Sequence, residues 1–132
     1  MEGIVSDANR LRGFSVAMTN VRSVELLRER AVEGMSIEIV LSAAIMEHVR
    51  TDFGETLHEA ATDGDLEMYE STTLPFGMFI GDMGEETRVA VVVYGPRSEL
   101  VGVILNDRPK AVTWATKLYR KYRQNATPVQ LD

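Results

Sequence analysis

One stretch decides the fold: Thr72-Thr73-Leu74-Pro75-Phe76-Gly77-Met78-Phe79-Ile80-Gly81-Asp82, in which a Pro-Phe-Gly corner leads into an apolar run. Pro75 restricts its own φ and pushes Leu74 toward extended geometry, while Gly77 admits backbone angles that other residues resist. The stretch therefore predicts a sharp bend followed by a strand. Because the apolar run after the corner contains no catalytic side chain, the stretch indicates scaffold or the wall of a ligand pocket.

Before the corner, strand patterns alternate with helical patterns. Apolar runs at 13–19, 37–41 and 66–70 predict strands, and the helical periodicity between them predicts two helices that Asn20 and Ser42 cap. Strand-helix-strand connections are right-handed and join parallel strands. We therefore expect three parallel strands in this half of the chain.

After the corner, the connections become short. Residues 78–80, 88–94 and 100–105 predict strands joined by hairpins, and Asn106 or Asp107 is expected to cap a last helix with Pro109 in its first turn. The predicted fold class is α/β with a mixed sheet. A β-α-β-α-β parallel half is followed by antiparallel hairpins and a C-terminal helix.

The domain organisation follows from the same patterns. Residues 1–12 are polar and predict a linker or a truncated N-terminal segment, 13–126 form one α/β regulatory domain, and 127–132 form a flexible tail. A chain of 132 residues with 45% hydrophobic content is sufficient for one core without disulfides or a structural metal.

Charge and cysteine content exclude several classes of function. Twenty acidic residues against 14 basic ones give a net charge of -6, which disfavours an autonomous nucleic-acid binder. The absence of cysteine excludes thiol nucleophiles and thiolate zinc sites. No apolar window approaches the roughly 18 residues of a membrane-spanning helix. We therefore expect a cytoplasmic protein without membrane contact.

No arrangement of residues predicts a reaction centre. Glu55 and His58 form a single Glu-x-x-His pair, whereas a di-metal bundle needs a second pair and further carboxylates on facing helices. Serine elbows and glycine-rich phosphate loops are missing. No catalytic residue, metal or cofactor is predicted, and we expect a protein that is not an enzyme.

A ligand cleft is expected where the parallel strands end, because ligands of open α/β sheets gather outside the carboxyl ends of the strands. The candidate ligand-binding residues lie near this edge or at the corner: Thr19, Asn20, Ser42, Glu70, Ser71, Pro75, Phe76 and Asp82. Capping or turn roles compete with ligand contact. The two interpretations are balanced for Thr19 and Ser42, and a turn role is favoured for Asp82.

Basic residues crowd the end of the last predicted helix. Lys117, Arg120, Lys121 and Arg123 suit the negative end of the helix dipole, so a solvated face with capping electrostatics is the favoured interpretation. Contact with DNA or with an acidic partner is the alternative.

Three segments occur together and in order: 64–69, the corner 74–80, and the Ala-Val-x-Trp-Ala helix 111–119. With them, the chain resembles the C-terminal domain of archaeal winged-helix transcriptional regulators, from about Arg12 to Ala126. More narrowly it resembles the methanogenesis-regulator middle domain, common in haloarchaeal proteins, and it is distantly similar to the phospholipase D-like fold. The His-x-Lys signature of phospholipase D is missing at His48 and His58, so hydrolysis is not implied.

The resemblance implies a non-catalytic domain that senses a small-molecule effector and forms a homodimer. It implies DNA binding only through a winged helix, and nothing before Phe14 in this chain predicts one. Two alternatives stay open from the residues. One is a small α/β enzyme with an unrecognised hydrolytic site, using Asp82 or Glu70 as a base, and the other is a stand-alone protein-interaction module.

Overall fold

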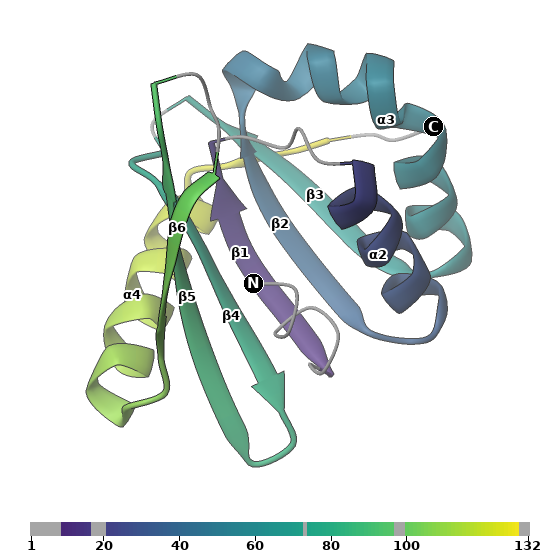
Figure 1. The fold of residues 1–132 in the computed structure, drawn as a ribbon. Coiled ribbons are helices and arrows are strands. Elements are labelled where there is room, and N and C mark those ends of the chain that lie inside the picture. Colours follow the sequence, from purple (N-terminus) through teal and green to yellow (C-terminus); the bar gives the residue numbers. More distant parts are fainter. Residues whose placement is uncertain (1–8, 17–20, 73, 97–99, 130–132) are drawn as a thin grey trace.

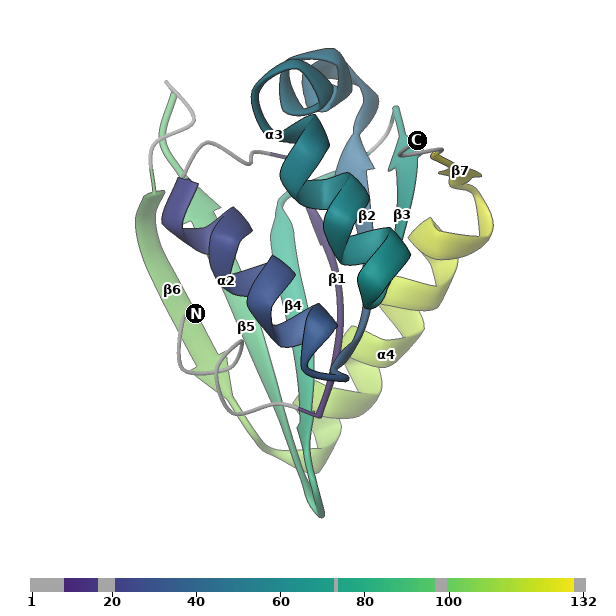
Figure 2. The ribbon, with the colours of Figure 1, turned by 90° about the vertical axis from the view of Figure 1, so that its right-hand side faces the viewer.

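A computed structural model describes residues 9–16, 21–72, 74–96 and 100–129. In these residues a twisted sheet forms the middle layer, and of the helices that they contain, two cover one face of the sheet and one covers the other (Figures 1 and 2). The elements follow in this order: β1 (Arg10–Ser15), α2 (Val21–Val32), β2 (Ser36–Ser42), α3 (Ala43–Asp63), β3 (Asp65–Ser71), β4 (Gly77–Met83), β5 (Glu86–Tyr94), β6 (Leu100–Asn106), α4 (Pro109–Gln124) and β7 (Thr127–Pro128).

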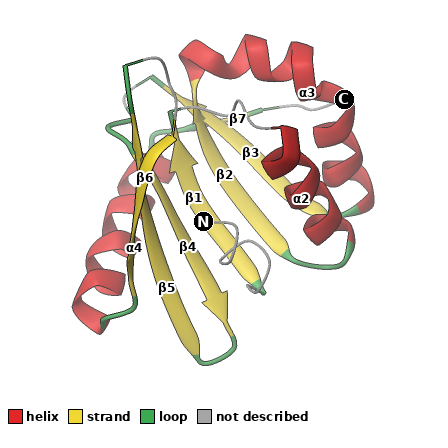
Figure 3. Cartoon of the chain, in the orientation of Figure 1, coloured by secondary structure: helices red, strands yellow, loops and turns green. Residues whose placement is uncertain are grey.

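Within the described part of the chain, the sheet has seven strands in the order β6-β5-β4-β1-β2-β3-β7, drawn in yellow in Figure 3. β1, β2 and β3 pair in parallel, whereas β4, β5 and β6 form an antiparallel meander that joins the sheet beside β1. The predicted fold class is therefore confirmed. The apolar strand β5 lies between β4 and β6 and is paired on both sides.

The Pro-Phe-Gly corner connects the two halves of the sheet. Between Ser71 and Gly77 the chain passes from β3 to β4, which lies beyond β2 and β1 in the strand order. The corner is held by packing, because the ring centroids of Phe76 and Phe14 lie 5.7 Å apart. The predicted change from parallel to antiparallel pairing thus occurs at this corner.

Each face of the sheet has its own hydrophobic cluster, because successive side chains of a strand point to opposite faces. Under α2 and α3 the largest fully buried residues include Leu11, Ile37, Ile39, Leu41 and Leu57. Under α4 the buried cluster contains these residues: Phe14, Val40, Tyr69, Met78, Ile80, Val89, Ala115 and Tyr119. The amphipathic α4 thus closes the second layer of the core.

Some boundaries differ from the sequence-based expectations. β1 begins at Arg10, so 10–12 belong to the sheet and not to a linker. The N-cap of α4 is Arg108 and neither of the two predicted residues, because Pro109 sets the first helical position. Asn106 instead accepts a hydrogen bond from the Arg108 backbone N–H at 2.9 Å, before the helix begins.

The expected tail also contains structure that was not predicted. Thr127–Pro128 forms β7, which pairs antiparallel with β3 opposite Tyr69 and Glu70. The Val129 N–H then donates to the Met68 carbonyl at 2.9 Å. A pair of residues is too short for any periodic pattern, so only the pairing with β3 defines this strand.

Candidate functional site

The described residues of the predicted carboxyl edge have mainly structural contacts. The Ser42 hydroxyl accepts a hydrogen bond from the Ala44 N–H at 3.3 Å and so caps α3, as predicted. Ser71 is buried, Phe76 packs on Phe14, and Pro75 is exposed. Thr19 and Asn20 lie outside the described residues.

Asp82 and Glu70 are placed differently from the other candidates. Asp82 is opposite Arg10 in the β1–β4 pairing, which puts it at the other end of the sheet from the corner. Its carboxylate accepts a hydrogen bond from the Thr87 hydroxyl at 2.9 Å and lies 3.7 Å from the Arg12 guanidinium. Both contacts lie within the sheet, so Asp82 does not join the carboxyl edge. Glu70 is half-buried between β2 and β7.

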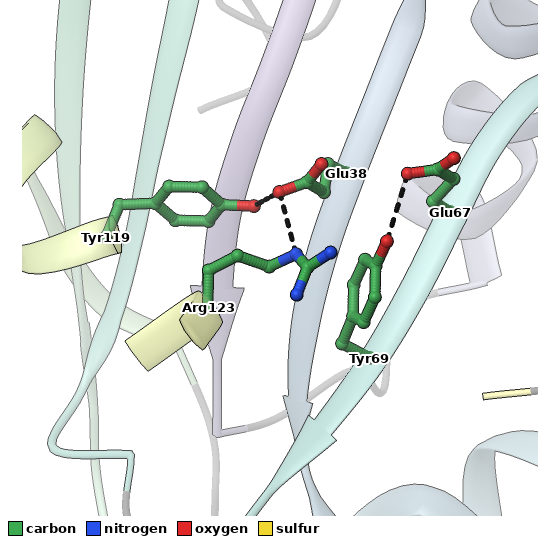
Figure 4. A network of polar contacts seen from close by, with 5 residues as sticks. All are labelled: Glu38, Glu67, Tyr69, Tyr119 and Arg123. Carbon is green, nitrogen blue, oxygen red and sulfur yellow. Dashed lines mark hydrogen bonds and ion pairs between the residues drawn. The ribbon is translucent and has the colours of Figure 1, made fainter. Parts of the chain in front are cut away.

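The main polar constellation lies between the sheet and α4 (Figure 4). One carboxylate oxygen of Glu38 accepts hydrogen bonds from the Tyr119 hydroxyl and, at 3.1 Å, from Nε of Arg123. The Arg123 guanidinium carbon lies 3.4 Å from the centroid of the Tyr69 ring. The Tyr69 hydroxyl donates in turn to Glu67 at 3.1 Å. Five side chains from β2, β3 and α4 thus form one connected network.

The position of this network follows from strand register. Arg12, Glu38 and Glu67 are register partners across β1, β2 and β3. Glu38 is four residues before Ser42, about 13 Å along the strand at the usual rise per residue. Glu38 and Glu67 therefore lie in the amino half of their parallel strands, away from the predicted cleft.

Both tyrosines of the network are shifted toward their neutral form. Burial, and then the hydrogen bond to Glu38, raises the pKa of Tyr119 far above its ordinary value. Burial, and then the hydrogen bond to Glu67, also raises the pKa of Tyr69. A tyrosine that keeps its proton at neutral pH acts as a hydrogen-bond donor, not as a base. The arrangement favours attachment of α4 to the sheet over proton transfer.

Sequence reasoning missed this network, although one signal was present. Glu38 is a single carboxylate inside the apolar strand 37–41, where a charged residue requires partners when it faces a packed layer. Tyr119 and Arg123 are four residues apart and so lie on one side of α4. No local pattern indicated that this side of α4 contacts Glu38.

A cavity of about 260 Å³ opens at the edge of the sheet, next to β7. Its wall consists of residues from the end of α3, from β3 and from the segment after α4: Ala61, Leu66, Glu67, Met68, Tyr69, Pro128 and Val129. Tyr69 belongs both to this wall and to the network under α4. Within the described ranges, no three His, Asp or Glu side chains come together as metal ligands.

The opposite edge of the sheet is apolar and exposed. Val101, Ile104 and Leu105 of β6 are 66%, 61% and 57% exposed. β6 pairs with β5 on one side only and ends the strand order. Within the described residues, this edge therefore presents apolar side chains, and no other strand pairs with its outer backbone groups.

Comparison with known proteins places this fold in a family. Residues 1–125 match the family described as "Methanogenesis regulatory protein FilR1, middle domain". The chain belongs to this family. The resemblance noted in the sequence is thereby confirmed. As a member of the FilR1 middle-domain family, the chain is a domain of the transcription-regulator class. No curated protein has a significant match.

A solved structure shares the fold of this FilR1 middle-domain member. It is described as "Structure of TrmBL2, an archaeal chromatin protein, shows a novel mode of DNA binding", and it matches with a TM-score of 0.75 at 13% identity. The match covers 97% of this chain and 48% of the other, so this chain spans about half the length of TrmBL2. At this identity the likeness concerns the fold alone. Among the helices that the structure describes, none has the length and apolarity needed to cross a membrane.

Proposed function

We propose that this FilR1 middle-domain member joins two subunits of a transcription regulator through its edge strand β6, without catalysing a reaction. The exposed apolar side chains of β6 carry the proposal. Three of its residues are more than half exposed, and they lie on both faces of the strand. Covering such a surface with a second copy removes apolar area from water and satisfies unpaired backbone groups.

The composition of β6 supports a second copy as the occupant. Natural edge strands avoid pairing by means of charged residues or proline, and Leu100–Asn106 contains neither. An antiparallel pair of identical strands is self-complementary about a two-fold axis, the commonest symmetry of soluble oligomers. Two β6 strands could thereby continue one sheet across both subunits.

The association is tested with a matched pair of charged variants. Ile104→Glu places a charge in the middle of the β6 surface, whereas Val32→Glu places one on α2, where Val32 is 43% exposed. Sedimentation equilibrium should give a dimer for the wild type and for Val32→Glu, and a monomer for Ile104→Glu. Circular dichroism checks that all three are folded. A monomeric wild type at high protein concentration, or an undiminished dimer of Ile104→Glu, would contradict the proposal.

The cavity beside β7 supports a second function, the sensing of a small effector. Among the side chains that line it, only Glu67 and Tyr69 carry a polar group, a combination that suits a small apolar molecule with a cationic group. Tyr69 stacks on Arg123, which bonds Glu38, so a ligand that displaces the Tyr69 ring would loosen α4. Binding at the sheet edge would thereby reach the C-terminal helix.

Benzylamine is a suitable probe for this site, with neutral benzyl alcohol as its control. In an NMR titration we expect benzylamine to shift the resonances of Ala61, Leu66 and Val129 more strongly than the alcohol does. Shifts confined to Ser42, Ser71 and Phe76 would instead support the carboxyl edge that the sequence predicts. If no resonance of either group shifts at the highest soluble concentration of benzylamine, the result would contradict the binding of an effector of this chemical class.

A further inference from the structure

The exposed face of α4 collects every lysine of the chain. Lys110, Lys117 and Lys121 are its only lysines, and the structure places all three in this one helix. At 3.6 residues per turn, spacings of seven and four residues put them in one stripe, with Trp114 between the first two. All three lysines are exposed and Trp114 is 50% exposed, whereas Tyr119 on the opposite side of the helix is buried.

The lysine stripe carries three positive charges, and no acidic side chain of the described residues forms an ion pair with them. α4 itself contains no Asp or Glu. An unbalanced basic stripe in a chain of net charge -6 is a local exception to the composition.

Helix electrostatics account for only part of the stripe. Cations in the last turns are stabilised by the negative end of the helix dipole, which suits Lys121. Lys110 lies in the first turn, where the same dipole disfavours a cation. The stripe runs the length of the helix, so attraction to something outside the domain is the better explanation.

We propose that the lysine stripe of α4 binds the phosphate backbone of duplex DNA without reading its sequence. The stripe spans about 16 Å at the helical rise, about half of a DNA helical turn. Lysine is a compact point charge that suits non-directional attraction to phosphates. Arginine is enriched and lysine depleted at protein interfaces, which makes an acidic protein the weaker fit. The stripe is complete in one copy of the chain, so the proposal does not rest on β6 pairing.

The only tryptophan of the chain provides a direct readout, because Trp114 lies within the stripe. A short mixed-sequence duplex is titrated into the full chain at low salt, and Trp114 emission and DNA anisotropy are recorded. We expect weak binding, and the logarithm of the association constant should fall linearly with the logarithm of the salt concentration. The slope should be about -3, because each of three phosphate contacts contributes about -0.9. Lys110→Gln/Lys117→Gln/Lys121→Gln should weaken binding by about tenfold or more and abolish most of that slope.

The control removes three positive charges elsewhere. Arg28→Gln/Arg50→Gln/Arg88→Gln lowers the net charge by the same amount and should retain the affinity and the slope of the wild type. Equal losses of DNA affinity in the two triple variants would show that the net charge alone determines binding, and would overturn the proposal. No DNA binding at low salt would also overturn it, as would stripe-dependent binding of polyglutamate that is tighter than that of DNA.

Discussion

The hydroxyl of Tyr119 on α4 donates a hydrogen bond to the carboxylate of Glu38 on β2, across a separation of 81 residues in the sequence. Nε of Arg123, one helical turn further along α4, donates to the same oxygen. A single acceptor thus holds donors from two successive turns of α4 and helps to attach this helix to the sheet.

Removal of the Tyr119 hydroxyl should destabilise the domain. Tyr119→Phe keeps the ring in the core but takes one donor from a half-buried carboxylate, which costs about 1–2 kcal/mol in the free energy of unfolding. Urea denaturation measures the change. Tyr122→Phe is the control, because the Tyr122 hydroxyl makes no hydrogen bond in the described part of the chain, and its cost should stay below about 0.5 kcal/mol. Equal effects of the two substitutions would contradict a role for the Glu38 contact.

Stability should decrease in alkaline solution partly through the network tyrosines. Burial and carboxylate contacts raise the pKa of Tyr119 and of Tyr69 above the ordinary value of 10.0. The unfolded chain therefore loses these protons first, so the free energy of unfolding is unaffected by them below about pH 10 and falls as the pH rises further. Urea denaturation across this range should show a smaller decline for Tyr119→Phe than for the wild type. If the free energy of unfolding fell equally with pH in both proteins, the raised pKa of Tyr119 would not contribute to the decline.

Replacement of Arg123 by lysine should loosen the end of α4. Lysine keeps the charge but lacks the planar group that stacks on Tyr69 and the Nε that bonds Glu38. The side chains of Arg123 and Glu38 are 32% and 26% exposed, so we expect a loss of about 0.5–1.5 kcal/mol. Hydrogen exchange should accelerate at 120–124 and remain unchanged in α2. The control is Arg120→Lys, which changes an exposed residue and should leave hydrogen exchange as in the wild type. Wild-type exchange in Arg123→Lys as well would contradict a role for the stacking of Arg123 on Tyr69.

Two glycine substitutions should have opposite effects. A Cβ at Gly13 of β1 would contact the Phe79 ring and approach the Met78 carbonyl oxygen to 2.5 Å, so Gly13→Ala should cost about 2 kcal/mol or more. A Cβ at Gly54 of α3 meets nothing within 4 Å, so Gly54→Ala should stabilise by about 0.5–1 kcal/mol. Thermal unfolding measures both. A stable Gly13→Ala protein would mean that β1 and β4 separate at little cost.

Much of the fold was predictable because its determinants are local. Pro75 and Gly77 restrict or free the backbone at a single turn, and Gly34, with φ 109°, adopts the left-handed conformation just after α2 that glycine accepts most readily. The cap of α4 was mispredicted because Asn106 and Asp107 are both good cap residues, whereas Pro109 defined the start of the helix. The sequence thus offered two competing signals for the start of this helix, the cap residues and the proline, and only the structure shows that the proline defines it.

The candidate site was less predictable. The rule for open α/β sheets pointed to the carboxyl edge, yet strand register groups Arg12, Glu38 and Glu67 nearer the other end. Asp82 faces Arg12 and Thr87, because β4 pairs antiparallel with β1 and so runs away from the corner. Each of these contacts depends on the order of strands in space.

By itself, the sequence determined the kind and order of nearly all elements, the bend at the Pro-Phe-Gly corner and the family, because these depend on backbone restrictions and side-chain periods within a few residues. Only the tertiary structure decided that β4 pairs with β1, that β7 closes the edge of β3 and that Tyr119 reaches Glu38. These contacts join residues far apart in the chain. Their choice depends on the packing of whole layers, which no local pattern specifies.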